Sequence, residues 1–149
     1  MTIEEAIKQK KFANEYTKLA VNILYTASWI DGLHIQALKP FGLSPQQFNV
    51  LRILRGSNQQ PIRLTDITER MVDRNSNATR LVEKLRQKGL LKREICKSNR
   101  RQVDIIITQK GIDLLAELDS HSDDWIKQFK SLQKIEAQDL NRILDKLRG

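Results

Sequence analysis

The chain has little of several features that mark other classes of protein. It holds 149 residues with one cysteine, three prolines and 5% aromatic residues. The single cysteine, Cys96, excludes an internal disulfide, which is typical of a reducing compartment. No apolar run approaches the roughly 20 residues that cross a bilayer, and the acidic start Met1–Ala6 lacks the pattern of a secretion signal. We therefore expect a cytoplasmic protein made of a single domain.

Residue patterns for catalysis and metal binding are also missing. The two histidines, His34 and His121, lie far apart and have no companions at metal-ligand spacing. The sequence contains no glycine-rich phosphate loop and no nucleophile motif. A redox role for Cys96 is left open, although no second cysteine is available to pair with it. We expect no enzyme activity, no metal and no cofactor.

Positive charge is abundant, and it is unevenly distributed. The net charge is +8. Residues 61–110 hold 13 Lys/Arg and 6 Asp/Glu, against 7 and 4 in residues 1–60 and 6 and 8 in residues 111–149. A basic segment of this kind favours a polyanionic partner.

Helical periodicity dominates both ends of the chain. Thr2 and Glu5 form a capping box that opens the first helix, and Gly32 interrupts the pattern before a short second helix over 33–38. After Thr108, a predicted helix cap, helical periodicity continues almost to Gly149. The apolar positions at three- and four-residue steps near the N-terminus are Tyr16, Leu19, Ala20, Ile23, Ala27 and Ile30.

The middle of the chain changes from helical to strand periodicity. Ser44-Pro45 begins a helix that ends at Gly56, and further helices are predicted over 64–71 and 75–88, joined by a turn at 72–74. Gly89 fits a left-handed helix end. Residues 91–95 and 102–107 then read as two strands, joined by the basic run 96–101. This order predicts a mainly α (α+β) fold, a winged helix-turn-helix with a two-stranded wing.

The predicted recognition helix begins with short polar side chains. Asparagine can pair with adenine, serine and threonine can contact bases or phosphates, and arginine can reach a guanine edge. Alternatively, these residues only cap the helix and are solvated. The candidates for base edges are Asn75, Ser76, Asn77, Thr79 and Arg80, and those for phosphates on this helix are Arg74 and Lys84.

The wing tip is the second candidate contact. Lys97 is a phosphate candidate, and Arg100 is the better candidate for a narrow minor groove, where the negative potential is strong. Arg101 lies next to the strand and is expected to brace the hairpin, although it too is a candidate DNA contact. The alternative is a solvated, charged turn.

The arrangement resembles the MarR (multiple antibiotic resistance regulator) family of bacterial transcription regulators. The match is sharpest over three stretches: Leu64–Met71, before the turn; Asn75–Arg93, which holds Thr-Arg-Leu-Val and Lys-Gly-Leu; and Asn99–Gly111, which ends in Thr-x-x-Gly. In the family, the position of Asn99 is commonly an aspartate that pairs with an arginine, so the resemblance implies a more loosely held wing. The corresponding division is one domain over 1–149, with a DNA-binding part at 44–111 and dimerisation helices at 1–38 and 112–149.

The resemblance implies a homodimer that binds a pseudo-palindromic operator in double-stranded DNA, usually as a repressor. The apolar flanking helices either form that dimer or pack within the chain. Many members release DNA when a small aromatic ligand binds beside the winged part. Candidates to line such a pocket are Tyr25, Trp29, His34 and Phe48, for which ordinary packing is the alternative.

The leading hypothesis is therefore a sequence-specific, DNA-binding transcription regulator. The rival is a winged-helix protein-interaction module that does not bind DNA. In an interaction module, the exposed side of the recognition helix would be expected to be neutral or to contain acidic residues among the basic ones. In this sequence the predicted recognition helix is basic.

Overall fold

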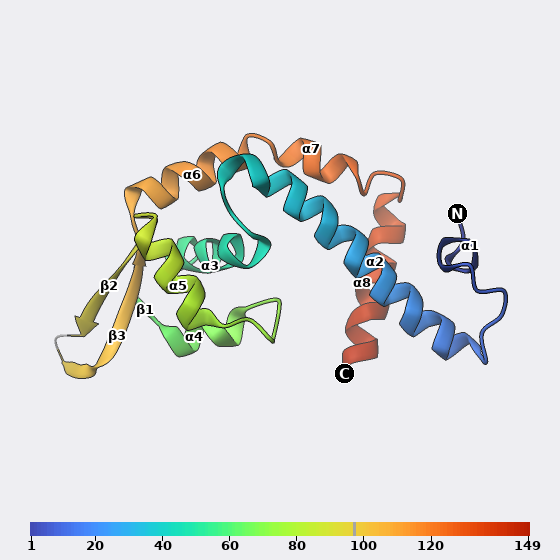
Figure 1. Ribbon diagram of the computed structural model, residues 1–149, viewed down its shortest axis with the longest axis horizontal. Coiled ribbons are helices and arrows are strands. Elements are labelled where there is room, and N and C mark those ends of the chain that lie inside the picture. The colour runs from blue at the N-terminus through green and yellow to red at the C-terminus, as the bar shows by residue number, and fades with distance from the viewer. Residues whose placement is uncertain (97) are drawn as a thin grey trace.

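The computed structural model describes residues 1–96 and 98–149, and it is mostly helical with a small antiparallel sheet (Figure 1). The elements, in chain order, are α1 (Ile3–Ile7), α2 (Glu15–Leu38), the 3-10 helix η1 (Lys39–Phe41), α3 (Pro45–Arg55), β1 (Ile62–Arg63), α4 (Leu64–Arg70), α5 (Ala78–Gln87), β2 (Leu91–Cys96), β3 (Asn99–Ile107), α6 (Gln109–Asp119), α7 (Ser122–Lys127) and α8 (Lys134–Arg148).

The hydrophobic core lies in the winged part of the chain, formed by α3, α4, α5, α6 and the sheet, together with Leu38 at the end of α2. The prediction of a mainly α, winged helix-turn-helix fold is confirmed. α2 runs away from this part toward α1, and it lies beside α8 at the other end of the molecule (Figure 1). The largest fully buried side chains are Val50, Leu51, Leu54, Ile67, Leu85, Leu91, Ile105 and Leu115.

The sequence-predicted helix boundaries near the N-terminus were wrong at two places. The capping box of Thr2 and Glu5 is present, but it opens only the five-residue α1, which ends at Lys8 with a φ of 55°. α2 starts afresh at Asn14, whose Oδ1 accepts a hydrogen bond from Thr17 N at 2.9 Å. α2 then passes through Gly32 without interruption, because one glycine costs a helix only about 1 kcal/mol.

Most of the predicted helix ends are confirmed. Ser44 and Gln47 form a complete capping box with Pro45 at the first helical turn, and Gly56 is the C-cap of α3. Thr108 caps α6 through a hydrogen bond from Gly111 N at 3.2 Å. Gly89, which follows α5, has the expected positive φ of 72°. These local signals act through neighbouring residues, which is why the sequence reveals them.

The sheet has three strands rather than the two that the sequence predicts. β1 pairs with β3, with Ile62 opposite Ile105, and the strand order is β1-β3-β2. Two residues are too few to show strand alternation in a sequence. β3 also begins earlier than predicted, at Asn99. Arg100 and Arg101 therefore lie in a strand and not in a flexible hairpin tip.

The C-terminal helices connect the winged part to α2. α6 is joined to α3 by an ion pair between Arg55 and Asp119, with Nη1 and Oδ2 2.6 Å apart. α7 and α8 then lead back along α2 (Figure 1). None of the helices in the described part of the chain combines the length and apolar character needed to span a membrane.

Two glycines should respond in opposite ways to alanine substitution. A Cβ on Gly111 would lie 2.3 Å from Leu90 O and 2.7 Å from Ile107 Cγ1, whereas a Cβ on Gly32 would meet nothing within 4 Å. We expect Gly111→Ala to lower the free energy of unfolding by about 2 kcal/mol or more, and Gly32→Ala to raise it by about 0.5–1 kcal/mol. Urea unfolding at a fixed protein concentration measures both. Equal stabilities for the two variants would contradict this packing at Gly111.

Candidate nucleic-acid interface

The turn before α5 is built by short polar side chains. Asp73 Oδ1 accepts a hydrogen bond from Asn75 N at 2.9 Å, and Asp73 O accepts one from Ser76 N at 3.2 Å. Asn49 of α3 stabilises the turn, because its Oδ1 accepts a hydrogen bond from Val72 N at 2.9 Å. These bonds satisfy backbone groups outside a helix, so α5 begins at Ala78 and not at Asn75 as the sequence predicts.

This later start changes the roles of three predicted base contacts. Asn77 is the N-cap of α5, and its Oδ1 accepts from Arg80 N at 3.1 Å. Asn75 is exposed in the turn. Ser76 Oγ is buried and has no hydrogen-bond partner among the described residues. The structure therefore places the hydroxyl of Ser76, a predicted base contact, below the surface, whereas Asn75 is exposed.

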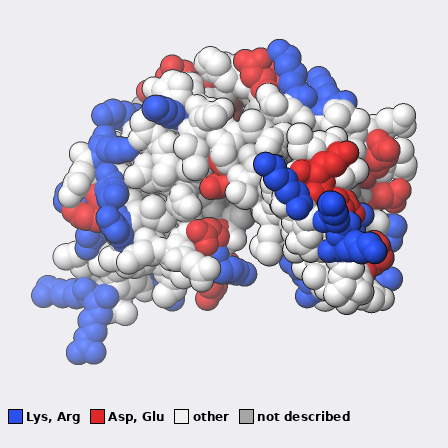
Figure 2. Space-filling view, turned by 45° about the vertical axis from the view of Figure 1, so that its right-hand side comes forward, with Lys and Arg blue, Asp and Glu red and all other residues white. Residues whose placement is uncertain are grey.

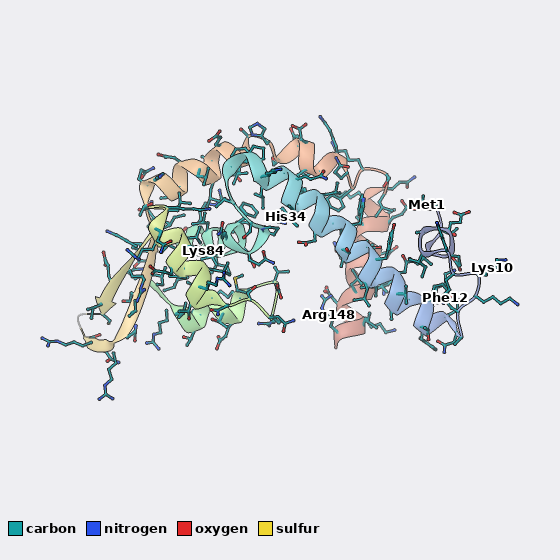
Figure 3. All side chains as sticks on the ribbon, viewed as in Figure 1. Met1, Lys10, Phe12, His34, Lys84 and Arg148 are labelled. Atoms are coloured by element: carbon teal, nitrogen blue, oxygen red, sulfur yellow. The ribbon has the colours of Figure 1, made fainter. Side chains whose placement is uncertain are left out.

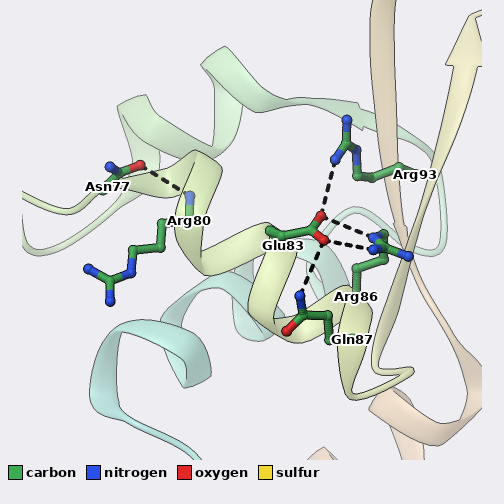
Figure 4. A network of polar contacts seen from close by, with 6 residues as sticks. All are labelled: Asn77, Arg80, Glu83, Arg86, Gln87 and Arg93. Atoms are coloured by element: carbon green, nitrogen blue, oxygen red, sulfur yellow. Dashed lines mark hydrogen bonds and ion pairs between the residues drawn. The ribbon is translucent and has the colours of Figure 1, made fainter.

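The first turns of α5 expose a basic surface. Thr79 and Arg80 follow the cap and are both exposed. Lys84 lies four residues after Arg80, so the two cations share one side of the helix. The Arg80 side chain extends away from the neighbouring polar network (Figure 4), and Lys84 projects from the middle of α5 (Figure 3).

Arg74 combines a structural contact with exposure. Its Nη1 donates a hydrogen bond to Glu69 O at 2.7 Å, near the C-terminal end of α4. This bond satisfies a carbonyl that the helix itself leaves unpaired. The residue is otherwise exposed beside the turn. Its position stays compatible with the predicted phosphate contact.

The wing carries two arginines on a regular strand. Arg100 and Arg101 are adjacent in β3, so they point to opposite faces of the sheet, and both are exposed. The predicted brace by Arg101 is not present, because its guanidinium makes no hydrogen bond or ion pair within residues 1–96 and 98–149. Asn99 Oδ1 instead accepts from Arg101 N at 3.1 Å. The predicted phosphate contact Lys97 lies outside the described residues.

A polar network that the sequence analysis missed joins α5 to the wing. Glu83 accepts hydrogen bonds from Arg86 on α5 and from Arg93 on β2 (Figure 4). The hydrogen bond from Arg86, and then the positive charge of both arginines, lowers the pKa of Glu83 to about 2. The three-residue spacing of Glu83 and Arg86 on one helix could have predicted the contact between them from the sequence. The approach of Arg93 depends on how β2 packs against α5.

Surface charge separates along the molecule. Lys and Arg side chains gather over the winged part on the left of Figure 2, where some extend beyond the body of the protein. Acidic and basic side chains are mixed toward the right. A basic surface around an exposed helix start and a wing is the electrostatic footprint of nucleic-acid binding.

Residues 43–103, which span α3 to the start of β3, match the sequence model of the MarR family. The transcriptional regulator MgrA of Staphylococcus aureus is 29% identical over 112 residues, which cover 75% of this chain and 74% of MgrA. Both matches point to the MarR family of transcriptional regulators. The fold of this chain is that of a winged helix-turn-helix protein, and the curated relatives that match it are transcriptional regulators of the helix-turn-helix type.

Solved structures of transcriptional regulators share the fold over almost the whole chain. A MarR variant from Escherichia coli in complex with operator DNA has a TM-score of 0.81 and 22% identity, covering 93% of this chain and 99% of that one. An organohalide-sensing transcriptional regulator in its 2,4-dichlorophenol-bound form has a TM-score of 0.80 and 22% identity, covering 94% and 86%.

The chain has a groove between the long helix α2 and the winged part. The groove has a volume of about 480 Å³ and is lined by residues of α2, α3 and the turn before α5. His34 and Phe48, two predicted pocket residues, line it, with ring centroids 5.4 Å apart. His34 lies between α2 and α3 (Figure 3). Arg52 of α3 and Val72 and Asp73 of the turn before α5 also line the groove.

The other two predicted pocket residues lie elsewhere. Trp29 does not line the groove, and it packs against Phe129 with ring centroids 6.4 Å apart. Tyr25 does not line the groove either and is 44% exposed. Burial lowers the pKa of His34, with a further lowering by Arg52, although Asp31 opposes both effects. The net effect favours the neutral form of the ring.

Cys96 and the histidines show no arrangement for metal binding. Within residues 1–96 and 98–149, no group of three or more His, Cys, Asp or Glu is placed to hold a metal ion. Cys96 Sγ lies 3.1 Å from Ser98 Oγ, and this hydrogen bond lowers the pKa of the thiol.

Proposed function

We propose that the protein is a homodimeric repressor that binds a pseudo-palindromic operator and is released by a small aromatic ligand. The observation that carries the DNA-binding part is the exposed basic start of α5 beside the exposed arginines of β3. The E. coli MarR variant, of similar fold, was solved with operator DNA. That likeness supports the same use of the winged part here.

The residues divide into three kinds of DNA contact. Asn75, Thr79 and Arg80 approach base edges in the major groove, since they are exposed at or just before the first turn of α5. Arg74 and Lys84 approach phosphates on either side. Arg100 enters the adjacent minor groove from the wing.

Dimerisation rests on apolar surface that a single chain leaves exposed. Ile143 of α8 is 49% exposed and Leu24 of α2 is 70% exposed. A mostly apolar groove of about 700 Å³ lies between α2 and α8. Exposed apolar surface of this kind marks an interface. A dimer also supplies the second recognition helix that a palindromic operator needs.

Ligand-induced release rests on the position of the groove lined by His34 and Phe48. The groove is bounded by Val72 and Asp73, which belong to the turn that sets the start of α5. A ligand that binds better to one position of this turn changes DNA affinity by linkage. The neighbour of similar fold was solved with 2,4-dichlorophenol bound. Arg52 supplies a positive charge for a phenolate or carboxylate.

The protein-interaction module without DNA binding is the weaker reading. Such a module would be expected to have a recognition helix whose exposed side is neutral or contains acidic residues among the basic ones. α5 holds one acid, Glu83, and that acid is held by two arginines. The exposed side of the helix therefore keeps its positive charge.

Selection from random duplex DNA should enrich an inverted repeat, and Arg100→Ala should weaken binding to it about tenfold while lowering the salt slope by about one. Lys130→Ala is the control, because it removes one positive charge from the segment between α7 and α8, remote from the wing. Fluorescence anisotropy over a salt series measures both. An unchanged affinity and salt slope for Arg100→Ala would remove Arg100 from the interface.

Ile143→Glu should convert dimers into monomers, because it places a charge in the apolar surface of α8. Ile95→Glu is the matched control, since Ile95 is also exposed but lies in the wing. Sedimentation velocity at micromolar concentration distinguishes the two species. A monomeric parent protein, or two variants that stay dimeric, would contradict the proposed interface.

The ligand 2,4-dichlorophenol should weaken operator binding by the parent protein and have less effect on Arg52→Gln. The substitution removes the charge that attracts a phenolate but leaves α5 unchanged, so affinity without ligand should stay close to that of the parent protein. Anisotropy titrations with and without the ligand provide the measurement. Full release of DNA from Arg52→Gln at the same ligand concentration would exclude this groove as the site.

A further inference from the structure

Glu83 is the one acidic residue of α5, and it lies on the outward side of the helix. The buried residues of α5 are Ala78, Val82 and Leu85, which direct residue 83 away from the core. It follows Thr79 by four residues, so it lies one turn beyond a proposed base contact. A carboxylate facing a polyanion opposes binding. Its place in the proposed DNA interface therefore requires a compensating role.

Both oxygens of the Glu83 carboxylate are already engaged. Oε1 accepts from Arg86 Nη2 at 2.7 Å, and Oε2 accepts from Arg86 Nε at 3.0 Å and from Arg93 Nη1 at 3.2 Å (Figure 4). Gln87 Nε2 lies 3.5 Å from Oε1. Arg86 belongs to the same helix, but Arg93 belongs to β2. Glu83 thus connects the recognition helix to the wing through a charged hydrogen bond.

The contact with Arg93 lies where the wing leaves the core. Leu91, at the base of β2, is 2% exposed, whereas Ile95 is 68% exposed. The register of the two strands shifts between Ile95 and Cys96. In the described part of the wing beyond Arg93, no side chain makes a hydrogen bond or ion pair with α5. Val103 of β3, opposite Ile95, also packs against the core. The outer wing therefore takes its direction from the strand base, from this apolar contact and from the Glu83–Arg93 pair.

We propose that Glu83 is a positioning residue that sets the wing relative to the recognition helix and so makes the protein selective for its operator. This inference rests on the proposed DNA binding. A wing at a set angle brings Arg100 to the minor groove only when the bases read by α5 lie at the matching distance along the duplex. Exposed ion pairs add little to folding stability. The effect is thus expected in selectivity and not in folding.

The test uses the ratio of affinities for the selected operator and for a random duplex of equal length. Glu83→Gln keeps the size of the side chain but removes its charge and the ion pair with Arg93. We expect this ratio to fall about tenfold, while random-duplex binding strengthens because a negative charge is lost. The melting temperature should stay close to that of the parent protein.

Glu94→Gln is the matched control. Glu94 lies next to Arg93 on β2, but its Oε1 pairs with Lys92 Nζ at 3.2 Å and not with α5. The substitution removes the same charge from the same region without touching the connection to the helix. We expect Glu94→Gln to strengthen binding to both duplexes equally and to leave the ratio unchanged.

Arg93→Gln distinguishes the effect of losing the Glu83–Arg93 ion pair from the effect of changing the total charge of the protein. It removes a positive charge, so electrostatics alone would weaken both affinities equally. A positioning role predicts that the ratio falls as it does for Glu83→Gln, and that the double variant loses little more than either single variant.

Three results would overturn the inference. Equal behaviour of Glu83→Gln and Glu94→Gln would mean that Glu83 acts by charge alone. A loss of discrimination confined to one base pair would make Glu83 a direct base reader. A parent protein that prefers no duplex over random DNA would instead remove the proposed function, and this inference with it.

Discussion

The burial of one side of α5 is the constraint on which the interface depends. Ala78, Val82 and Leu85 occupy one stripe of the helix and lie in the core with the buried strand residues Leu91 and Ile105. Each fully buried Val, Leu or Ile side chain contributes about 1.5–3 kcal/mol. A rotation of α5 by one residue would expose Leu85. Burial therefore sets the direction of every polar side chain on the opposite side of the helix.

Local hydrogen bonds then decide where the recognition helix begins. Asp73 satisfies the backbone of the turn, and Asn77 caps the helix. These hydrogen bonds engage side chains that the sequence alone would suggest as contacts to DNA bases. The side chains left exposed at this end of the helix include Asn75, Thr79 and Arg80. The cap and the proposed base contacts therefore divide one short polar segment between them.

The two ends of the molecule differ in how completely they bury their apolar residues. The winged part encloses Leu51, Leu54 and Ile67 fully. By contrast, α2 and α8 leave large apolar side chains half exposed along a groove. A chain that folds with this apolar surface exposed to water lowers its free energy when the surface is buried in an interface. The groove lined by His34 and Phe48 lies between these two regions, which suits a site that links them.

The sequence by itself determined the order of the elements from α3 to β3 apart from β1, most helix caps and the basic character of the middle segment. These features depend on residues within about four positions of one another, as at Ser44–Gln47 and at Gly89, so they can be predicted from the sequence alone. The uninterrupted α2, the strand β1 and the late start of α5 could not be read in this way. Each results from competition between a local preference and packing or hydrogen bonding with other residues.

Only the tertiary structure decided which polar side chains are free to act. It buried Ser76 Oγ, separated Trp29 and Tyr25 from the groove that holds His34, and left the Arg101 side chain without its expected contact among the described residues. It also brought Arg93 to Glu83 across ten positions in the sequence. The physical reason is that burial and ion pairing depend on distances in space, which the packing of α5 against the wing strands sets and no sequence spacing records.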